Sequence, residues 1–545
     1  MTNNSSGVII HEQVFGEVCA FGTPVYLGSD GMWRKTDASN TATCTGDVGL
    51  GLDTAEILTL GYLENPAWSW VTGSPVYFSQ AAGTLTQTKP EGDAVVRVAG
   101  YPISATVLHF CPADPVTSQY LIGDLPGVTG DVLLHTGDGY EAVARDTAIP
   151  SLQNRVLRIK DSAGNDLEIH QVWIPRFRSA GFSQPNLNGI LCGGFWVDKF
   201  QACQPAASNV SRGGLSANSP GTGAGASCLP HVVPWTDVSW NTAKTVLENR
   251  GGAANKQGGS CAVFGSATNG KAEFLVASTG HLIGRHIEIV QGGTTYYRRI
   301  IKQGIADEAK YVKVYPDLPA AITSADTYTI IGHHMITPYE WFSLAAWAMT
   351  FRYRLGLGYP MGNNDWGKDI GDARSVETEG LADPVKSGYS NHEKARCLTG
   401  SGPLSWSLNG REDGVWDLNG NAWEWEMQQV VTDGSAMTLA PGFPGAGTDI
   451  TPPGSSGQQV TAMYDADTPV DGLSLNSDVC VPTGQSSGGS GEYGHDGYWF
   501  NLSANTYAAL RGGYWSLGLL FGLWALNLRL TPTYTGCYFG FRGSS

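Results

Sequence analysis

The chain has 545 residues, which is enough for two to four domains, and 41% of them are hydrophobic while only 15% are charged. The formal net charge is −16 and no stripe of Lys or Arg is visible, which argues against a nucleic-acid partner. The 72 glycines, 28 prolines and 17 tryptophans favour short strands and tight loops over long helices.

The first ten residues lack the charged and apolar stretches of a secretory signal, so we expect a protein made in the cytoplasm without a signal peptide. The ten cysteines show no CxxC spacing and are expected to be mostly reduced, buried and structural. The longest apolar run, residues 517–530, is too short to span a bilayer and contains Arg529. Membrane insertion is therefore not expected.

Residues 1–112 are predicted to form all-β N-terminal modules with an internal repeat. The stretch GTPVYL at 22–27 recurs as GSPVYF at 73–78, and a glycine turn and an alternating strand follow each copy. We expect two similar β units packed together. They resemble the small β-modules that begin phage capsid-decoration and fibre proteins, which implies attachment to a particle. A generic β-sandwich without that role is the alternative.

Residues 113–187 carry Pro, Gly and Asp turns, with a short strand expected at 156–160, and are predicted to be a connector or small β segment. An aromatic-rich part follows from about residue 188. Helical spacing of apolar residues predicts a helix over 237–249 with Thr236 or Asp237 as its N-cap. A second helix is predicted from Thr337 to Met349. It begins with a proline at its first position and a capping-box glutamate at its third.

Between the two helices, residues 262–333 alternate between apolar and polar side chains. Gly292-Gly293 stands between two of these alternating stretches, where a hairpin turn needs residues that adopt positive φ. The pattern predicts a small inserted β-domain.

Three blocks stand in order in the C-terminal part: WTDVSWNTA at 235–243 with MITPYEW at 335–341, VWDLNGNAWEW at 415–425, and LRGGYW at 510–515 with GFR at 540–542. They resemble the C-type lectin fold of the formylglycine-generating-enzyme type. That branch includes the variable proteins of diversity-generating retroelements. The resemblance implies an α+β class, with a C-type lectin fold over 188–545 and a variable ligand-binding region at 510–542.

The residues of these blocks also have physical roles of their own. The NGN stretch at 419–421 provides a turn that can take positive φ. Trp423 and Trp425 alternate on a strand and so point to one face, where they are expected to form core. Arg511 and Arg542 are expected to bond buried backbone or carboxylate groups.

Enzymes of the branch use two cysteines that closely follow the RGG-W motif for copper-dependent oxidation. Here the corresponding stretch, residues 516–522, contains no cysteine, and Cys537 stands alone. A thiolate is the soft ligand that this metal chemistry needs. The chain also lacks GxSxG and HExxH motifs. We therefore predict a binding protein and not an enzyme, and a relative of the oxidase that has lost its cysteines is an alternative.

In the variable proteins, diversified positions are interleaved with a fixed framework after the RGG-W motif. Retroelement diversification of asparagine codons cannot yield Lys, Gln, Glu, Met or Trp, and the interleaved positions contain none of these five. The resemblance thus implies fifteen ligand-binding positions: Tyr514, Ser516, Leu517, Leu519, Leu520, Phe521, Arg529, Leu530, Thr531, Thr533, Tyr534, Thr535, Gly536, Cys537 and Tyr538.

If they are exposed together, these leucines and tyrosines form an interaction patch of the kind that binding surfaces prefer. The alternative is that the run is a buried strand pair of the core. The hypothesis is a receptor-binding, tail-fibre-like adhesin of a phage virion that binds a host-surface protein or glycan. The oligomeric state stays open, with a homotrimer as one option, and a purely structural virion protein is a further alternative.

Four oxygen-bearing side chains with mostly alternate spacing raise the question of calcium: Asp413, Asp417, Asn419 and Asn421. They lack the glycine and the distal glutamate of an EF-hand loop. Relatives of this fold often hold calcium near here, but the same residue types also form turns. No cofactor is therefore predicted, and calcium is kept as an option.

Overall fold

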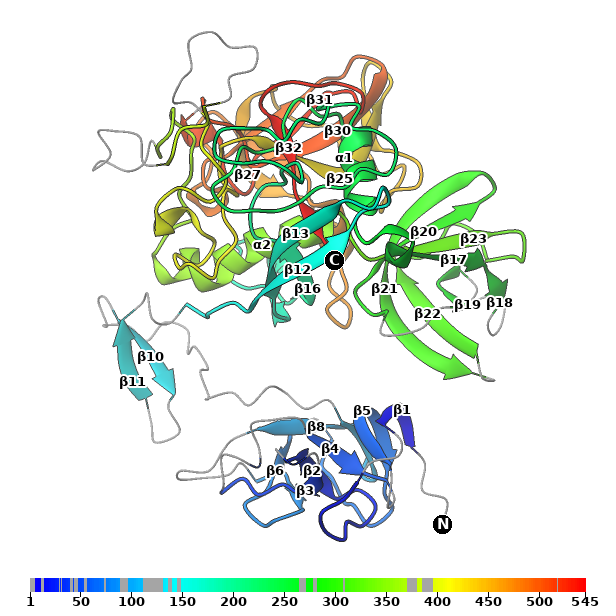
Figure 1. Ribbon diagram of the computed structural model, residues 1–545. Coiled ribbons are helices and arrows are strands. Elements are labelled where there is room, and N and C mark those ends of the chain that lie inside the picture. The colour runs from blue at the N-terminus through cyan, green and yellow to red at the C-terminus, as the bar shows by residue number, and fades with distance from the viewer. Residues whose placement is uncertain are drawn as a thin grey trace. The chain divides into compact units, whose positions relative to one another are not determined.

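The computed structural model describes residues 5–10, 14–28, 30, 32–39, 43, 48–52, 56–72, 75–88, 97–110, 131–135, 140–144, 149–263, 271–277, 282–306, 309–369, 380–384, 396–516 and 518–545. The chain divides into two compact units, Met1–Ala148 and Ile149–Ser545. Both are mostly β with few helices (Figure 1). No helix in the described ranges is long and apolar enough to cross a membrane.

A nine-stranded sheet forms the first unit, with a separate hairpin of β10 (Asp131–His135) and β11 (Tyr140–Ala144). The strands of the sheet are β1 (Ser5–Ile10), β2 (Pro24–Leu27), β3 (Trp33–Lys35), β4 (Val48–Gly51), β5 (Ile57–Glu64), β6 (Val76–Phe78), β7 (Leu85–Thr86), β8 (Val98–Pro102) and β9 (Val107–Phe110).

The strand order of this sheet repeats itself. Strand β2 pairs with β3 and β4, and β6 pairs with β7 and β8 in the same way. The two halves meet where β5 pairs with β9, so the sheet runs β3-β2-β4-β5-β9-β8-β6-β7. Val25 and Val76, which occupy the same position of the repeated hexapeptide, are both fully buried. Each half of the sheet thus contains one copy of the repeated hexapeptide, in β2 and in β6.

The second unit begins earlier than the sequence indicated. Ile149 and Leu152 lie in its core, and β12 (Asn154–Lys160) and β13 (Asp166–Ile174) join a five-stranded sheet. The other strands of that sheet are β16 (Phe195–Asp198), β33 (Gly543–Ser544) and β24 (His334–Met335). The described residues from 149 to 187 are therefore not a connector. The short strand expected at 156–160 is confirmed as part of β12, which pairs with the adjacent β13. The sequence could not show that β24 and β33, which lie far along the chain, join the same sheet.

Three α-helices occur among the described residues: α1 (Trp240–Glu248), α2 (Pro338–Phe351) and α3 (Leu475–Val479). Helix α1 starts later than predicted, with Ser239 as its N-cap. Asp237 has a φ of 61°, in the left-handed region, so it cannot belong to a right-handed helix. The capping box of α2 is confirmed, since Thr337 accepts from the backbone of Glu340 and Glu340 bonds back to Thr337.

Between α1 and α2 lies a seven-stranded sheet with a hydrophobic core of its own. Its strands are β17 (Lys256–Ser260), β18 (Ala262–Val263), β19 (Glu273–Val276), β20 (His286–Gln291), β21 (Thr294–Ala306), β22 (Ala309–Tyr315) and β23 (Thr327–Ile331). Gly292 and Gly293 form the β20–β21 turn, both with positive φ. The expected hairpin is confirmed, and the sheet, which we call the insert, stands beside α1 (Figure 1).

An eight-stranded sheet forms the centre of the second unit and packs with α2 over the largest core. Its strands are β25 (Trp423–Thr432), β26 (Met437–Leu439), β27 (Gln458–Met463), β28 (Pro482–Ser486), β29 (Gly497–Phe500), β30 (Asn505–Arg511), β31 (Leu526–Leu530) and β32 (Phe539–Phe541). A short pair, β14 (Phe177–Arg178) and β15 (Leu191–Cys192), lies apart from it.

The described cysteines are all free thiols, and seven of the eight are buried. Burial raises the pKa of thiols such as Cys203 and Cys480 to about 12, so they stay protonated. The described cysteines therefore have the reduced, structural character that the sequence predicted.

Candidate functional site

Strand β25 separates two kinds of buried side chain. Trp423 and Trp425 lie in one core cluster together with Phe539 and Phe541, as their alternation predicted. Glu424 and Glu426, on the same strand, are buried too, although nothing in the sequence indicates their burial. The turn before the strand has the expected geometry, with positive φ at Gly420 and Asn421.

Two arginines neutralise these buried glutamates. Arg542 donates from Nε and Nη2 to the two carboxylate oxygens of Glu424, each at 2.8 Å, and also bonds the carbonyls of Asp198 and Trp416. Arg511 donates to Glu426 at 3.0 Å and to the carbonyl of Cys480. The expectation that both arginines bond buried backbone or carboxylate groups is confirmed.

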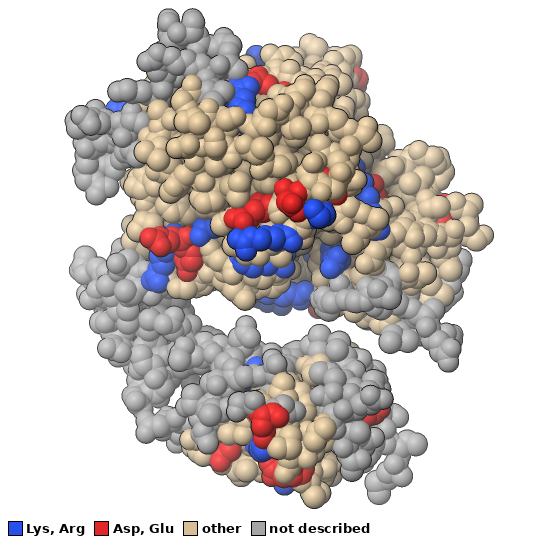
Figure 2. Space-filling view, in the orientation of Figure 1, with Lys and Arg blue, Asp and Glu red and all other residues tan. Residues whose placement is uncertain are grey.

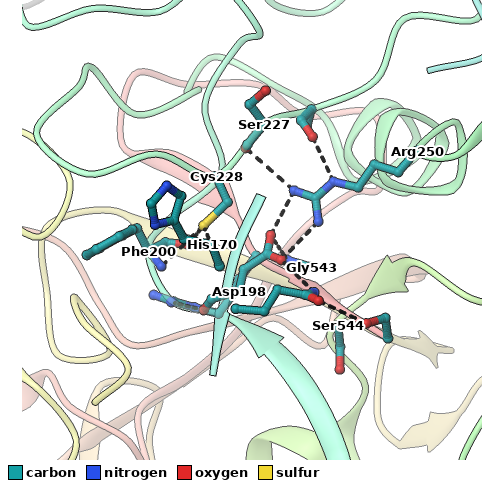
Figure 3. Close-up of polar contacts among 12 residues, drawn as sticks. His170, Asp198, Phe200, Ser227, Cys228, Arg250, Gly543 and Ser544 are labelled. Atoms are coloured by element: carbon teal, nitrogen blue, oxygen red, sulfur yellow. Dashed lines mark hydrogen bonds and ion pairs between the residues drawn. The ribbon is translucent and has the colours of Figure 1, made fainter. Parts of the chain in front are cut away.

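A third buried ion pair, between Arg250 and Asp198, contacts the C-terminal strand β33. Figure 3 shows Arg250 facing Asp198, with nitrogen–oxygen distances of 3.0 and 2.7 Å. The same carboxylate accepts from the backbone of Gly543. Breaking a buried pair of this kind by removing one partner costs about 3–5 kcal/mol. The three pairs link β16, β25, β30 and the residues directly after β32, and we call these strands the framework.

Two loops on this framework, together with the last two residues of β31, carry the predicted binding positions. One loop, residues 512–525, joins β30 to β31, and another, residues 531–538, joins β31 to β32. Exposed positions are Leu519, Arg529, Thr533, Tyr534 and Thr535. Half-buried positions are Tyr514, Ser516, Leu520, Leu530, Thr531, Gly536 and Tyr538. We call these twelve residues the loop face, and Leu517 lies outside the described residues.

Two of the fifteen positions are buried and belong to the framework. Phe521 is 2% exposed and packs against Trp423 and Trp499 at ring distances of 5.1 and 5.3 Å. Cys537 is 8% exposed, and its carbonyl accepts from Arg396. The sequence could not separate Phe521 from its exposed neighbours because an irregular loop has no periodicity.

Tyr514 and Tyr534 are partly exposed and pack against buried aromatic residues. The ring of Tyr514 lies 5.1 Å from both Phe521 and Tyr538, and 5.3 Å from the buried Trp515. Tyr534 is 44% exposed and packs edge-on against Phe539. Rings held in this way present contact area that loses little entropy on binding.

One exposed aromatic residue beside the loop face was missed. Trp366 is 39% exposed, with φ of +54°, and its backbone donates to the carbonyl of Trp515 at 2.8 Å. Gly518 donates in turn to the carbonyl of Asn364. The turn-forming composition of residues 362–367 indicates a loop. It does not indicate that this loop lies beside residues 515–518. A bulky residue with positive φ is strained, which makes this position a candidate for function.

Asp496 holds the loop of residues 512–525 by a hydrogen bond to its backbone. Its carboxylate accepts from the backbone of Trp524 at 2.7 Å. A Cβ on Gly522 would collide with this carboxylate, so the loop can approach only with glycine there. Burial raises the pKa of Asp496 to about 7, while the bonds from Trp524 and Ala525 act against the rise.

Figure 2 shows that charged side chains gather in a band over β12, β13 and β16. The surface of the second unit over β30, β31 and β32 is largely uncharged in the same view. A ligand of the loop face would therefore meet mainly aromatic, aliphatic and hydroxyl groups.

The four residues considered for calcium have separate partners. Asp413 accepts from the backbone of Leu152, and Asp417 from that of Gly400. Asn419 bonds the carbonyl of Pro360, and Asn421 bonds Gln201. Within the described ranges, no group of three or more His, Cys, Asp or Glu residues could hold a metal ion. The structure thus gives these four side chains turn and packing roles.

No family model and no curated protein matches the chain. Among solved structures, it is similar to the P3c variant of Major Tropism Determinant, with 10% identity, a TM-score of 0.23, and coverage of 82% of this chain and 91% of that chain. The I1 and U1 variants follow with 11% and 12% identity and a TM-score of 0.18. Each comparison covers 83% of this chain, with 92% of the I1 chain and 91% of the U1 chain. Scores this low establish neither a shared fold nor a shared ligand.

Proposed function

We propose that this chain is a receptor-binding adhesin of a phage virion whose loop face contacts a protein or glycan on the host surface. The single observation that supports the proposal most is the division of residues 510–542. Largely buried strands and ion pairs fix the backbone, while the loops between the strands and the end of β31 carry exposed side chains. Such a division lets one backbone present many different surfaces.

The proposal includes the fold and its diversification. We infer a C-type lectin fold of the formylglycine-generating-enzyme type, with the loop face diversified by a retroelement. The motif order supports this, as does the pairing of the last strand, β33, with β16 near the start of the unit. The test is the DNA downstream of the gene. A near-copy of the segment encoding 514–542, differing only at adenines and lying beside a reverse transcriptase, is the expected result.

The repeated sheet of residues 1–112 is proposed to attach the protein to the particle. Many copies on one particle would give avidity, so each contact with the host can be weak. A homotrimer is one assembly that would serve this purpose.

Binding is tested with the full chain carrying a fluorescent label, applied to a panel of intact bacterial strains. The face variant combines Leu519→Ser, Arg529→Ala and Tyr534→Ala, all at exposed positions. We expect binding to fall at least tenfold. The melting temperature should move by no more than about 2 °C, because surface substitutions seldom change stability by more than about 0.5 kcal/mol.

A matched control variant changes exposed residues elsewhere in the second unit, namely Val470→Ser, Leu404→Ser and Arg158→Ala. It should bind as the wild type does. Equal binding by the face and control variants would contradict the proposal. A large loss of stability in the face variant would favour a buried strand pair instead.

A further inference from the structure

Strand β12 forms one edge of the five-stranded sheet, because β13 is the only described strand that pairs with it. It is seven residues long, contains no proline and pairs with β13 without a register shift. Proteins often protect an edge strand by making it short, by placing a proline in it or by a bulge. Strand β12 has none of these three features, so its outer edge is able to pair with another strand.

The outward backbone groups of β12 belong to alternate residues. Just before the strand, the carbonyl of Gln153 accepts from Trp173, and just after it Asp161 donates to Asn165, so the odd-numbered residues bond β13. The even-numbered residues direct their N–H and C=O groups outward: Asn154, Val156, Arg158 and Lys160. Within the described ranges, no backbone hydrogen bond reaches these outward groups. A second strand could therefore bond all of them.

The charged side chains of β12 do not oppose such pairing, because each already has an opposite charge in β13. Arg158 contacts Glu168 at 2.9 Å, and Lys160 contacts Asp166 at 2.7 Å. Val156 lies two residues before Arg158 on the same face and is 44% exposed. The edge thus presents a row of ion pairs and one exposed aliphatic side chain, and neither would repel a second copy.

The sequence of β12 is complementary to an antiparallel copy of itself in one register. In that register Leu157 lies opposite Leu157 of the partner subunit, and Val156 lies opposite Arg158 of the partner subunit. Lys160 then meets Asn154 of the partner subunit. All four outward residues are paired, which gives about eight backbone hydrogen bonds. Sliding the partner by two residues in either direction loses one of these pairs, and in one direction it sets Arg158 against its own copy, which is unfavourable.

We propose that two copies of this chain associate through β12 in this register, so that their five-stranded sheets join across a twofold axis at Leu157. Such a contact closes after two copies, so β12 alone does not build a homotrimer. One strand pair is smaller than the about 1,200–2,000 Å² of a stable complex, so the dimer should depend on concentration. The proposal does not rest on receptor binding, because no loop-face residue lies in β12.

The first test is sedimentation of the full chain from about 1 μM to about 100 μM, where a dimer with a micromolar Kd forms. We expect the mass to rise toward that of a dimer. Val156→Pro removes an outward N–H that β13 does not use, a position where an edge strand tolerates proline. It should weaken the association at least tenfold. Val156→Thr is the matched control, because it keeps the N–H and a branched side chain, and it should associate as the wild type does.

Cross-linking tests the register directly and does not need Val156→Pro to fold. Leu157 and Leu157 of the partner subunit form a pair without mutual backbone bonds, whose Cα atoms lie about 4.5 Å apart, within the range of a disulfide. Leu157→Cys should therefore give a disulfide-linked dimer on mild oxidation. Ile159→Cys is the control, since Ile159 is also half-buried on the same face of β12. Its two copies would lie about 13 Å apart along the strands, which is too far for a disulfide.

The wild-type chain, oxidised in the same way, gives the background from its own cysteines. Cross-linking of Leu157→Cys that does not exceed that of Ile159→Cys would contradict the proposed register. A wild type that stays monomeric up to about 100 μM would overturn the proposal, as would a Val156→Pro variant that associates as strongly as the wild type.

Discussion

Arg542 is fully buried, and its guanidinium donates hydrogen bonds to the carboxylate of Glu424 and to two backbone carbonyls. An Arg542→Leu variant leaves the carboxylate of Glu424 buried without its cation. We expect a loss of about 3–5 kcal/mol in the free energy of unfolding, measured by urea denaturation. The comparison is Arg158→Leu, which breaks the exposed pair with Glu168 and should change stability by less than about 1 kcal/mol. Similar losses in both variants would show that Arg542 is not part of a buried framework.

Asp496 makes the stability of the second unit depend on pH. Its pKa of about 7 in the fold exceeds the unfolded value of 3.8, so between these two values the folded state holds a proton that the unfolded state has released. The stability that the protonated carboxyl contributes is therefore fully present below pH 3.8 and is lost as the pH rises to about 7.

The measurement compares the wild type with Asp496→Asn, which imitates the protonated side chain at every pH. Relative to the variant, the wild type should lose up to about 4 kcal/mol between pH 4 and pH 8, following the shift of about three pKa units. A difference that does not change across this range would mean that Asp496 titrates normally.

At the scale of elements, the loop after β30 depends on glycines that permit close approach. Gly513 has a φ of +87°, and a Cβ there would overlap the ring of Phe521. Gly513→Ala should therefore displace Phe521, destabilise the unit and weaken receptor binding. Gly410 also has positive φ, but a Cβ would meet nothing within 4 Å. Gly410→Ala should cost only the backbone strain of about 1–2 kcal/mol and keep binding. Equal behaviour of the two variants in thermal melting and binding would rule out this role for Gly513.

The same elements show what a sequence can predict. Capping residues and alternation act locally, so the start of α2, the Gly292-Gly293 hairpin and the burial of Trp423 could all be foreseen. Burial of Phe521 and the position of Trp366 depend on contacts between distant segments and on irregular backbone. No local pattern encodes these, which explains why the first was misplaced on the surface and the second was missed.

At the scale of the whole molecule, the two units have separate cores. Val25 and Val76 lie within the first unit, and the Arg542 framework lies within the second. Chains with independent cores do not follow a single two-state transition. Calorimetry of the full chain should therefore show two transitions, and Arg542→Leu should lower only one of them.

The unfolding transition of the first unit can be tested with substitutions in the two halves of its repeated sheet. Val25 and Val76 occupy equivalent strands of the two halves and are both fully buried, so Val25→Ala and Val76→Ala each remove two buried methyl groups. Val25 packs with Trp33 and Ile57, whereas Val76 belongs to the larger core cluster of this unit. Each variant should lower the transition that Arg542→Leu leaves unchanged, to the extent of a few kcal/mol. If either valine variant lowered both transitions together, the units would unfold as one. Binding changes in the face variant could then no longer be assigned to the second unit alone.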